Sequence, residues 1–200
     1  VTPTFTGIET VTQSAAAGGT NILALASTTG VTRVNIAETA NAVGVTVSGL
    51  ETGSTVSILQ NASATQTVDT VAGASVTVLS TVVKGGGALA VTDAANVTLT
   101  ANLQASDLIA TSVDAVDTTA LTVTSTGTFD IDTGLITATD KVETLTLTTD
   151  TAGGNVVVSD VADADSMTTL TVTAVGGNIT LGEVGGTGSS GSGTAEALAT

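Results

Sequence analysis

Apolar and small polar residues alternate along most of the chain, which is the pattern of strands that bury one face. In these segments Val, Leu or Ile occupies every second position, and Thr occupies most of the positions between. Because Thr is β-branched, it fits a pleated strand while its hydroxyl group faces water. The alternation predicts the strands Val43 to Val47, Val76 to Leu79, Val97 to Thr100, Leu121 to Thr124, Leu145 to Thr148 and Leu170 to Thr173. We therefore expect an all-β protein.

The strands recur at a nearly constant interval. Leu145 follows Leu121 by 24 residues, and Leu170 follows Leu145 by 25. Repeats of this length are typical of a solenoid, whose coils bury their apolar faces only by stacking on one another. The sequence therefore predicts a parallel β-solenoid, with these three leucines in one interior row at a spacing of about 4.8 Å.

A second series of strands interleaves with the first and is marked by asparagine. Asn96, Asn155 and Asn178 each precede an apolar residue, and the last two are 23 residues apart. Clusters of Gly, Asn, Asp and Ser between the strands supply turns that tolerate positive φ. Short strands separated by such turns also fit an antiparallel β-sandwich, which is the alternative fold. The interleaved repeat favours the solenoid.

Two segments depart from the strand pattern. Leu103 to Ala115 has a spacing that a short helix could use, although its β-branched residues disfavour one. Residues 187–200 are rich in Gly and Ser, which is the composition of a flexible linker. We expect residues 1–186 to form the solenoid region of a longer chain.

The composition excludes most enzyme classes. The chain contains no His and no Cys, so it cannot supply a Ser-His-Asp triad or the usual ligands of zinc, iron–sulfur and haem sites. Three Lys and Arg residues against eighteen Asp and Glu residues give a net charge of −15. Nucleic acid is therefore not an expected partner, whereas cations are. No apolar run approaches the length of a membrane span, so we expect a chain that does not cross a membrane.

Short Glu-Thr phrases resemble the repeats of bacterial surface-layer (S-layer) proteins that are exported by type I secretion. These phrases are Gly7-Ile-Glu-Thr-Val-Thr12, Gly49-Leu-Glu-Thr52 and Val142-Glu-Thr-Leu-Thr-Leu-Thr148. Large secreted adhesins have a similar repeat composition. The resemblance implies a β-solenoid segment of an extracellular protein that self-associates into a coat on the bacterial cell surface, with Ca²⁺ bound between turns. The Gly-Gly-x-Gly-x-Asp repeat of calcium-binding β-rolls is not present intact.

Clustered aspartates are the candidate metal ligands. Calcium prefers six to eight oxygen ligands, and aspartates two or three residues apart in a turn can direct carboxylates to one ion. The candidates are Asp130 and Asp132, then Asp160, Asp163 and Asp165, and, as a weaker pair, Asp114 and Asp117. The competing interpretation is that each aspartate caps its own turn and is solvated.

Two other functions fit parts of the pattern. Asp130 and Asp132 could imitate the carboxylate pair of a glycan-cleaving β-helix, but Phe5 and Phe129 are the only aromatic residues that could stack on a sugar. We therefore predict no enzymatic activity. Thr-x-Thr phrases in successive coils also suggest an ice-binding array, but such arrays usually need coils of near-invariant length, and these intervals vary.

Overall fold

The structure is a computed structural model in which residues 7–15, 21–38, 44–58, 64–80, 87–101, 107–138 and 141–186 are described. All sixteen strands in this part of the chain join one hydrogen-bonded network, and every pairing between them is parallel. The chain is therefore a parallel β-solenoid, as the repeat predicts. An antiparallel sandwich is excluded, because each strand pairs with the equivalent segment of the next coil.

The strands follow the chain as β1 (Thr10–Ala15), β2 (Asn21–Ala24), β3 (Arg33–Glu38), β4 (Val45–Leu50), β5 (Ser54–Ile58), β6 (Gln66–Ser80), β7 (Leu89–Ala101), β8 (Leu108–Ile109), β9 (Ser112–Ala115), β10 (Ala120–Ser125), β11 (Ile131–Asp132), β12 (Leu135–Thr137), β13 (Thr144–Thr149), β14 (Val156–Ala162), β15 (Thr169–Thr173) and β16 (Ile179–Gly186). The segment for which a helix could be considered contains β8 and β9 where it is described, so the helical alternative is wrong there. Residues 187–200, the predicted linker, lie outside the described residues.

The coils have three strand-bearing faces. Face A contains β1, β3, β5, residues 74–80 of β6, residues 94–101 of β7, β10, β13 and β15. Face B contains β2, β4, the first parts of β6 and β7, β9, β12 and the second parts of β14 and β16. Face C contains β8, β11 and the first parts of β14 and β16.

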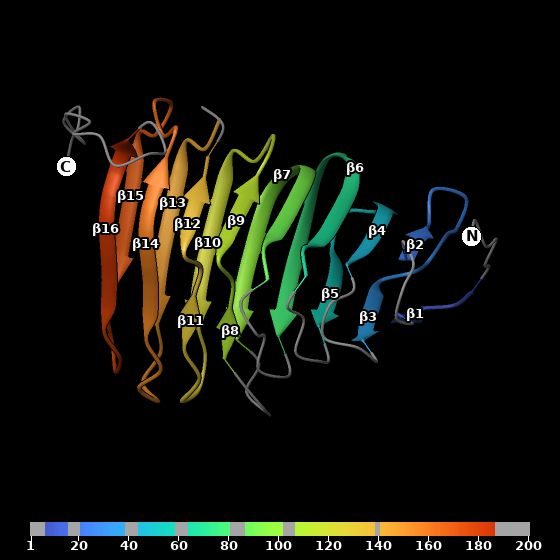
Figure 1. Cartoon of the computed structure of the whole chain (residues 1–200), viewed down its shortest axis with the longest axis horizontal. Helices are drawn as coiled ribbons and strands as arrows, with labels where there is room; N and C mark the ends of the chain where they lie inside the picture. The colour runs from blue at the N-terminus through green and yellow to red at the C-terminus, as the bar shows by residue number, and fades with distance from the viewer. Residues whose placement is uncertain are drawn as a thin grey trace.

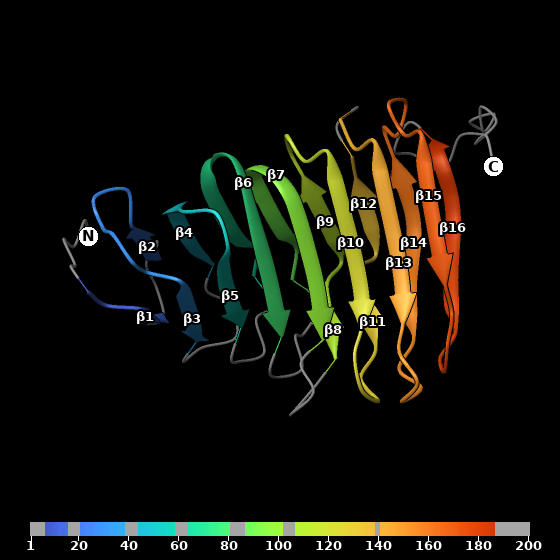
Figure 2. The same ribbon diagram turned by 180° about the vertical axis from the view of Figure 1, so that it is seen from behind.

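Faces B and C lie end to end in one layer, because β14 and β16 run through both (Figure 1). Face A forms the opposite layer, which is in front in Figure 2. The molecule is thus a flattened rod with its strands across the long axis and its backbone hydrogen bonds along that axis (Figures 1 and 2).

The core is a set of apolar columns between the two layers. The predicted leucine row is confirmed, because Leu121 pairs in register with Leu145 and Leu145 pairs with Leu170. Leu145 is fully buried, since coils lie on both sides of it. The prediction that the three asparagines mark one series of strands is wrong. Asn96 pairs with Ala120 on face A, whereas Asn155 and Asn178 precede strands of face C. An asparagine followed by an apolar residue occurs in both layers, so this pattern alone does not distinguish them.

Residues with positive φ mark the corners between faces B and A. The residues with positive φ at these corners are Gly30, Gly53, Gly73, Asp93, Asp117 and Asp163. Glycine has no Cβ to clash in this conformation, and aspartate is among the few other residues that adopt it readily. The residue at this corner therefore changes from glycine to aspartate along the chain, while its φ stays positive.

A different constraint acts where face C meets face B. Gly134 has a φ of 59°, and a Cβ atom at this position would lie 2.1 Å from the carbonyl oxygen of Thr111. Only glycine lets the two coils approach this closely. The Asp130 to Gly134 turn is thus shaped first by coil stacking.

Candidate functional site

A ladder of acidic and amide side chains runs along the edge where face C begins. Asp107, Asp130, Asn155 and Asn178 occupy this edge in four successive coils. Three hydrogen bonds connect these residues. The backbone N–H of Asp130 donates to the side-chain oxygen of Asp107 at 2.8 Å, that of Asn155 donates to Asp130 at 2.7 Å, and that of Asn178 donates to Asn155 at 2.9 Å. The side-chain amide of Asn155 also donates to the same oxygen of Asp130, at 2.9 Å. The ladder therefore fastens neighbouring coils where the backbone changes direction.

The sequence carries a signal for this ladder that the metal hypothesis did not use. Each ladder residue is followed at once by an apolar residue that begins a strand, and the intervals are 23, 25 and 23 residues. Asp107 and Asn155 were missed as partners of Asp130 because they are far from it in sequence. Their contact depends on the register of the coils.

Asp130 and Asp132, the first predicted calcium pair, have separate hydrogen-bonding partners. The Oδ1 atom of Asp132 accepts from the backbone N–H of Gly134 at 3.0 Å, which is the geometry of an aspartate that closes its own turn. Asp130 is engaged in the ladder instead. Each carboxylate keeps a second oxygen that accepts no hydrogen bond within the described part of the chain.

The second predicted cluster, Asp160, Asp163 and Asp165, is spread over the corner between faces B and A. The Oδ1 atom of Asp160 accepts from the backbone N–H of Glu183 in the next coil, at 2.9 Å. Asp163 occupies a corner position with a φ of 53°. Asp165 is exposed. Asp160 thus contacts the next coil, Asp163 forms the corner, and Asp165 contributes surface charge.

The weaker pair is also divided between two settings. Asp114 lies on face B, where it pairs with Ala90 and Thr137 of the neighbouring coils. Asp117 is a corner residue with a φ of 66°, and its carboxylate forms an ion pair with Lys141 of the next coil. Both partners of this pair are well exposed, so water and salt screen it.

Among the described residues, no group of three or more acidic side chains lies close enough to share one metal ion. The fold does bring carboxylates together in pairs between coils. Asp160 pairs in register with Glu183, and Asp107 lies next to Asp130 along the ladder. A calcium ion bound at such a pair would take two to four oxygens from the protein and the rest from water. Binding between coils therefore fits the donor set better than binding within one turn.

Asp150 is a structural carboxylate that the sequence did not single out. It accepts hydrogen bonds from the backbone N–H groups of Gly127, at 2.7 Å, and of Ala152, at 2.9 Å. These two bonds, that of Gly127 first, lower the pKa of Asp150 below its ordinary value of 3.8. Asp150 therefore holds the turn before face C through its charged form.

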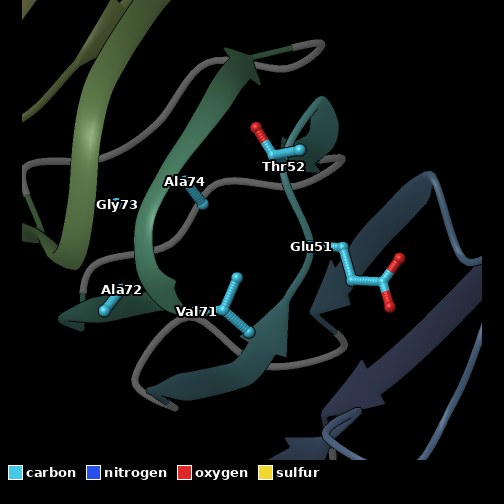
Figure 3. Close-up of a pocket in the computed structure, with 6 residues that line it drawn as sticks. All are labelled: Glu51, Thr52, Val71, Ala72, Gly73 and Ala74. Carbon is cyan, nitrogen blue, oxygen red and sulfur yellow. The ribbon is translucent and has the colours of Figure 1, made fainter.

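An open hollow lies between the corner that follows β4 and the corner within β6. It is lined by Glu51, Thr52, Val71, Ala72, Gly73 and Ala74. Figure 3 shows the Glu51 carboxylate directed away from Val71, so the hollow has an apolar floor and no converging polar groups. The Thr52 hydroxyl already accepts from the backbone N–H of Ser75 at 3.1 Å. This hollow offers no catalytic or ligand-binding chemistry.

The last described coil presents apolar surface that earlier coils bury. Val172 belongs to the inward column of face A that contains Val123 and Leu147, both of which are fully buried. Val172 itself is 49% exposed, and Leu170 is only partly buried. Within the described chain, β15 pairs only with β13 and β16 only with β14. Among the described residues, no strand pairs with the outer edge of β15 or of β16.

No family model, curated protein or solved structure matches this chain. A search of the described residues for a helix long and apolar enough to cross a membrane finds none.

Proposed function

We propose that the chain is a structural, self-assembling segment of an extracellular bacterial surface-layer protein, stabilised by calcium. A repeat region of a secreted adhesin is the nearest alternative, and it would use the same rod. The observation that carries the proposal is the stacking of the described coils, in which every strand pairing is parallel and all sixteen strands join one ladder that further coils can extend.

Coil stacking supplies the driving force for assembly. Full burial of a valine side chain contributes about 1.5–3 kcal/mol, so covering Val172 and Leu170 with another coil is favourable. At the opposite end Val11 is only partly buried, although it pairs with the fully buried Val34. Because all described coils run in the same direction, coils of a second copy can continue the same parallel ladder. Such head-to-tail contacts produce extended assemblies when the rotation between successive copies does not close a ring.

Calcium fits this role through charge. A chain with a net charge of −15 repels itself as it compacts and repels its neighbours as it assembles. Ions bound between coils, at the Asp107 and Asp130 pair or at the Asp160 and Glu183 pair, would reduce that repulsion. The proposed location is thus the coil interface.

The test is the association state of the purified chain as a function of protein and calcium concentration. We expect size-exclusion chromatography with light scattering to show growing species, and electron microscopy to show rods lengthened end to end. Val172→Lys places a charge in the apolar column of the last described coil and should abolish the growth. Val71→Lys is the matched control, because Val71 is 46% exposed but lies at the corner within β6, several coils away from β15.

Three outcomes would contradict the proposal. One is a wild-type chain that stays monomeric at every concentration with and without calcium. Another is equal loss of assembly in both lysine variants. The third is assembly that Val172→Lys leaves unchanged.

A further inference from the structure

Two columns of threonine run side by side along the outer surface of face A. In the first column Thr55, Thr77, Thr98, Thr122, Thr146 and Thr171 are paired in register through six successive coils. In the second column Thr100, Thr124, Thr148 and Thr173 are paired through four coils. The four coils that contain β7, β10, β13 and β15 therefore each present a Thr-x-Thr pair in the same place.

The unequal coil lengths do not disturb this array. Members of the first column are 22, 21, 24, 24 and 25 residues apart in sequence. The pairings of β10 with β7, of β10 with β13 and of β13 with β15 nevertheless contain no register shift. The connections between strands take up the differences in coil length. Residues 116–119 join β9 to β10, whereas the longer segment 163–168 joins β14 to β15. A regular array on face A therefore does not require coils of equal length.

The array has the fixed spacing of a sheet. Neighbouring parallel strands are about 4.8 Å apart, and alternate residues of one strand are about 6.6 Å apart. Threonine holds this spacing well, because branching at Cβ restricts rotation of the side chain. The result is a grid of threonine side chains on face A, which is the layer in front in Figure 2.

The hydroxyl groups of the grid are available to an external partner. Within the described part of the chain, the side chains of the six threonines that β10, β13 and β15 contribute to the two columns make no hydrogen bond. These residues are Thr122, Thr124, Thr146, Thr148, Thr171 and Thr173. All six are partly or fully exposed. Each hydroxyl can donate one hydrogen bond and accept two.

Charge is segregated away from this surface. The strand segments of face A from β5 to β15 contain no Asp, Glu, Lys or Arg, in a chain whose net charge is −15. Face B and the corners contain the acidic residues instead, among them Asp69, Asp114, Asp160 and Glu183. A cationic partner would be attracted to those faces. Face A is suited to a neutral, hydrogen-bonding and ordered surface.

We propose that face A is an ice-binding surface, with the Thr-x-Thr pairs of β7, β10, β13 and β15 as its contact residues. Ice is neutral, and its water molecules repeat on a fixed lattice, so a rigid grid can engage many of them at once. Individually weak contacts then add as they do in any multivalent interaction. A sugar polymer is the less suitable occupant, because Phe5 and Phe129 are the only aromatic residues in the chain. The proposal does not depend on end-to-end assembly.

The test uses the dilute, monomeric fraction of the intact chain. We expect thermal hysteresis, faceted ice crystals and incorporation of the protein into slowly grown ice. Thr146→Tyr, at the centre of the grid, should lose most of the incorporation and hysteresis. Thr137→Tyr is the matched control, since Thr137 is a partly exposed threonine of β12 on face B, and it should behave as the wild type. Circular dichroism and melting verify that each variant folds.

A second pair of variants keeps the proposal testable if the tyrosine disrupts the fold. Thr146→Val keeps the methyl group and the branching, whereas Thr146→Ser removes both, and both variants fit a strand. Because the grid depends on a branched side chain that also has a hydroxyl group, we expect each variant to retain less ice incorporation than the wild type and more than Thr146→Tyr. Equal losses in Thr146→Tyr and Thr137→Tyr would overturn the proposal, as would a wild-type chain that neither enters ice nor shapes it. A dimer that Thr146→Tyr abolishes, without ice incorporation by the wild type, would identify face A as a contact between copies instead.

Discussion

The backbone N–H of Gly127 donates a hydrogen bond to the Asp150 carboxylate of the next coil, with 2.7 Å between the nitrogen and Oδ2. The same carboxylate closes its own turn through Ala152. One charged group thus fixes a turn and attaches that turn to its neighbour, although the two residues are 23 positions apart. Contacts of this kind tie stability to the protonation of single aspartates.

Acid should therefore weaken the fold through Asp150. Hydrogen bonds lower its pKa in the folded state, so its contribution is fully present above the unfolded value near 3.8 and is lost as pH falls through the lower folded value. In chelator-containing buffer, Asp150→Asn should melt below the wild type at neutral pH, and the difference should shrink below about pH 4. Melting curves measured across pH give the comparison. Asp165→Asn is the control, because Asp165 is exposed and accepts no hydrogen bond within the described chain; equal behaviour of the two variants would contradict the assignment.

The ladder on the edge of face C should contribute measurably to stability. Asp130→Ala removes the acceptor of two hydrogen bonds from Asn155, and we expect a loss of about 1–3 kcal/mol in the free energy of unfolding. Asp130→Asn keeps an acceptor oxygen and reproduces the residue type that Asn155 supplies in the next coil. It should therefore recover most of the stability in urea titration. An alanine variant as stable as the wild type would show that the ladder is not a structural element.

Calcium should raise the melting temperature if ions occupy the coil interfaces. Native-state binding stabilises by RT ln(1 + [L]/Kd), which is about 2.7 kcal/mol at a hundredfold excess over Kd. Melting in millimolar calcium and in chelator, at fixed ionic strength, measures the effect. Glu183→Gln, with Asp160→Asn, should reduce the calcium-dependent difference more than Asp163→Asn with Asp165→Asn, since only the first pair is in register between coils. The double variant Asp130→Asn with Asp132→Asn tests the first predicted cluster in the same way.

Equal melting points with and without calcium would assign all seven candidate aspartates to turns and coil contacts. Asparagine is a suitable replacement at Asp163, because it also adopts positive φ. A changed melting temperature in the variant that contains Asp163→Asn would then report the loss of carboxylate charge.

Position along the rod should determine the cost of a core truncation. Leu145 is fully buried between two coils, so Leu145→Ala should cost about 2–5 kcal/mol in the free energy of unfolding. Leu170 occupies the same column but is only partly buried in the last described coil, so Leu170→Ala should cost less. Denaturant titration of the two variants compares chemically identical changes. Similar losses would mean that the last coil is covered in solution.

The architecture was predictable because one signal repeats in every coil. Alternation predicted the strands, and the nearly constant intervals between Leu121, Leu145 and Leu170 favoured parallel pairing, since stacked coils repeat one strand at each turn. The helical alternative near Leu108 failed because local spacing cannot show that Ile131 and Asp132 pair with that segment. Tertiary register overrides local propensity at such short strands.

The sites were less predictable for a related reason. The chemistry of Asp130 is determined by Asn155, and that of Asp160 by Glu183, each more than twenty residues away. Clusters counted within one turn miss these partners. The Thr-x-Thr phrases could be found in the sequence. Their alignment into columns could not, because it depends on how the corners accommodate coils of unequal length.

The direction of the backbone hydrogen bonds has a mechanical consequence. Because they lie along the rod, tension applied at its two ends loads the coils one after another and does not shear many bonds at once. A coil of 24 residues, which occupies about 4.8 Å of rod, releases roughly 80 Å of chain when it opens. A rod of this kind yields coil by coil and absorbs energy over a long extension, and each released coil has its neighbour as a template on which to close again.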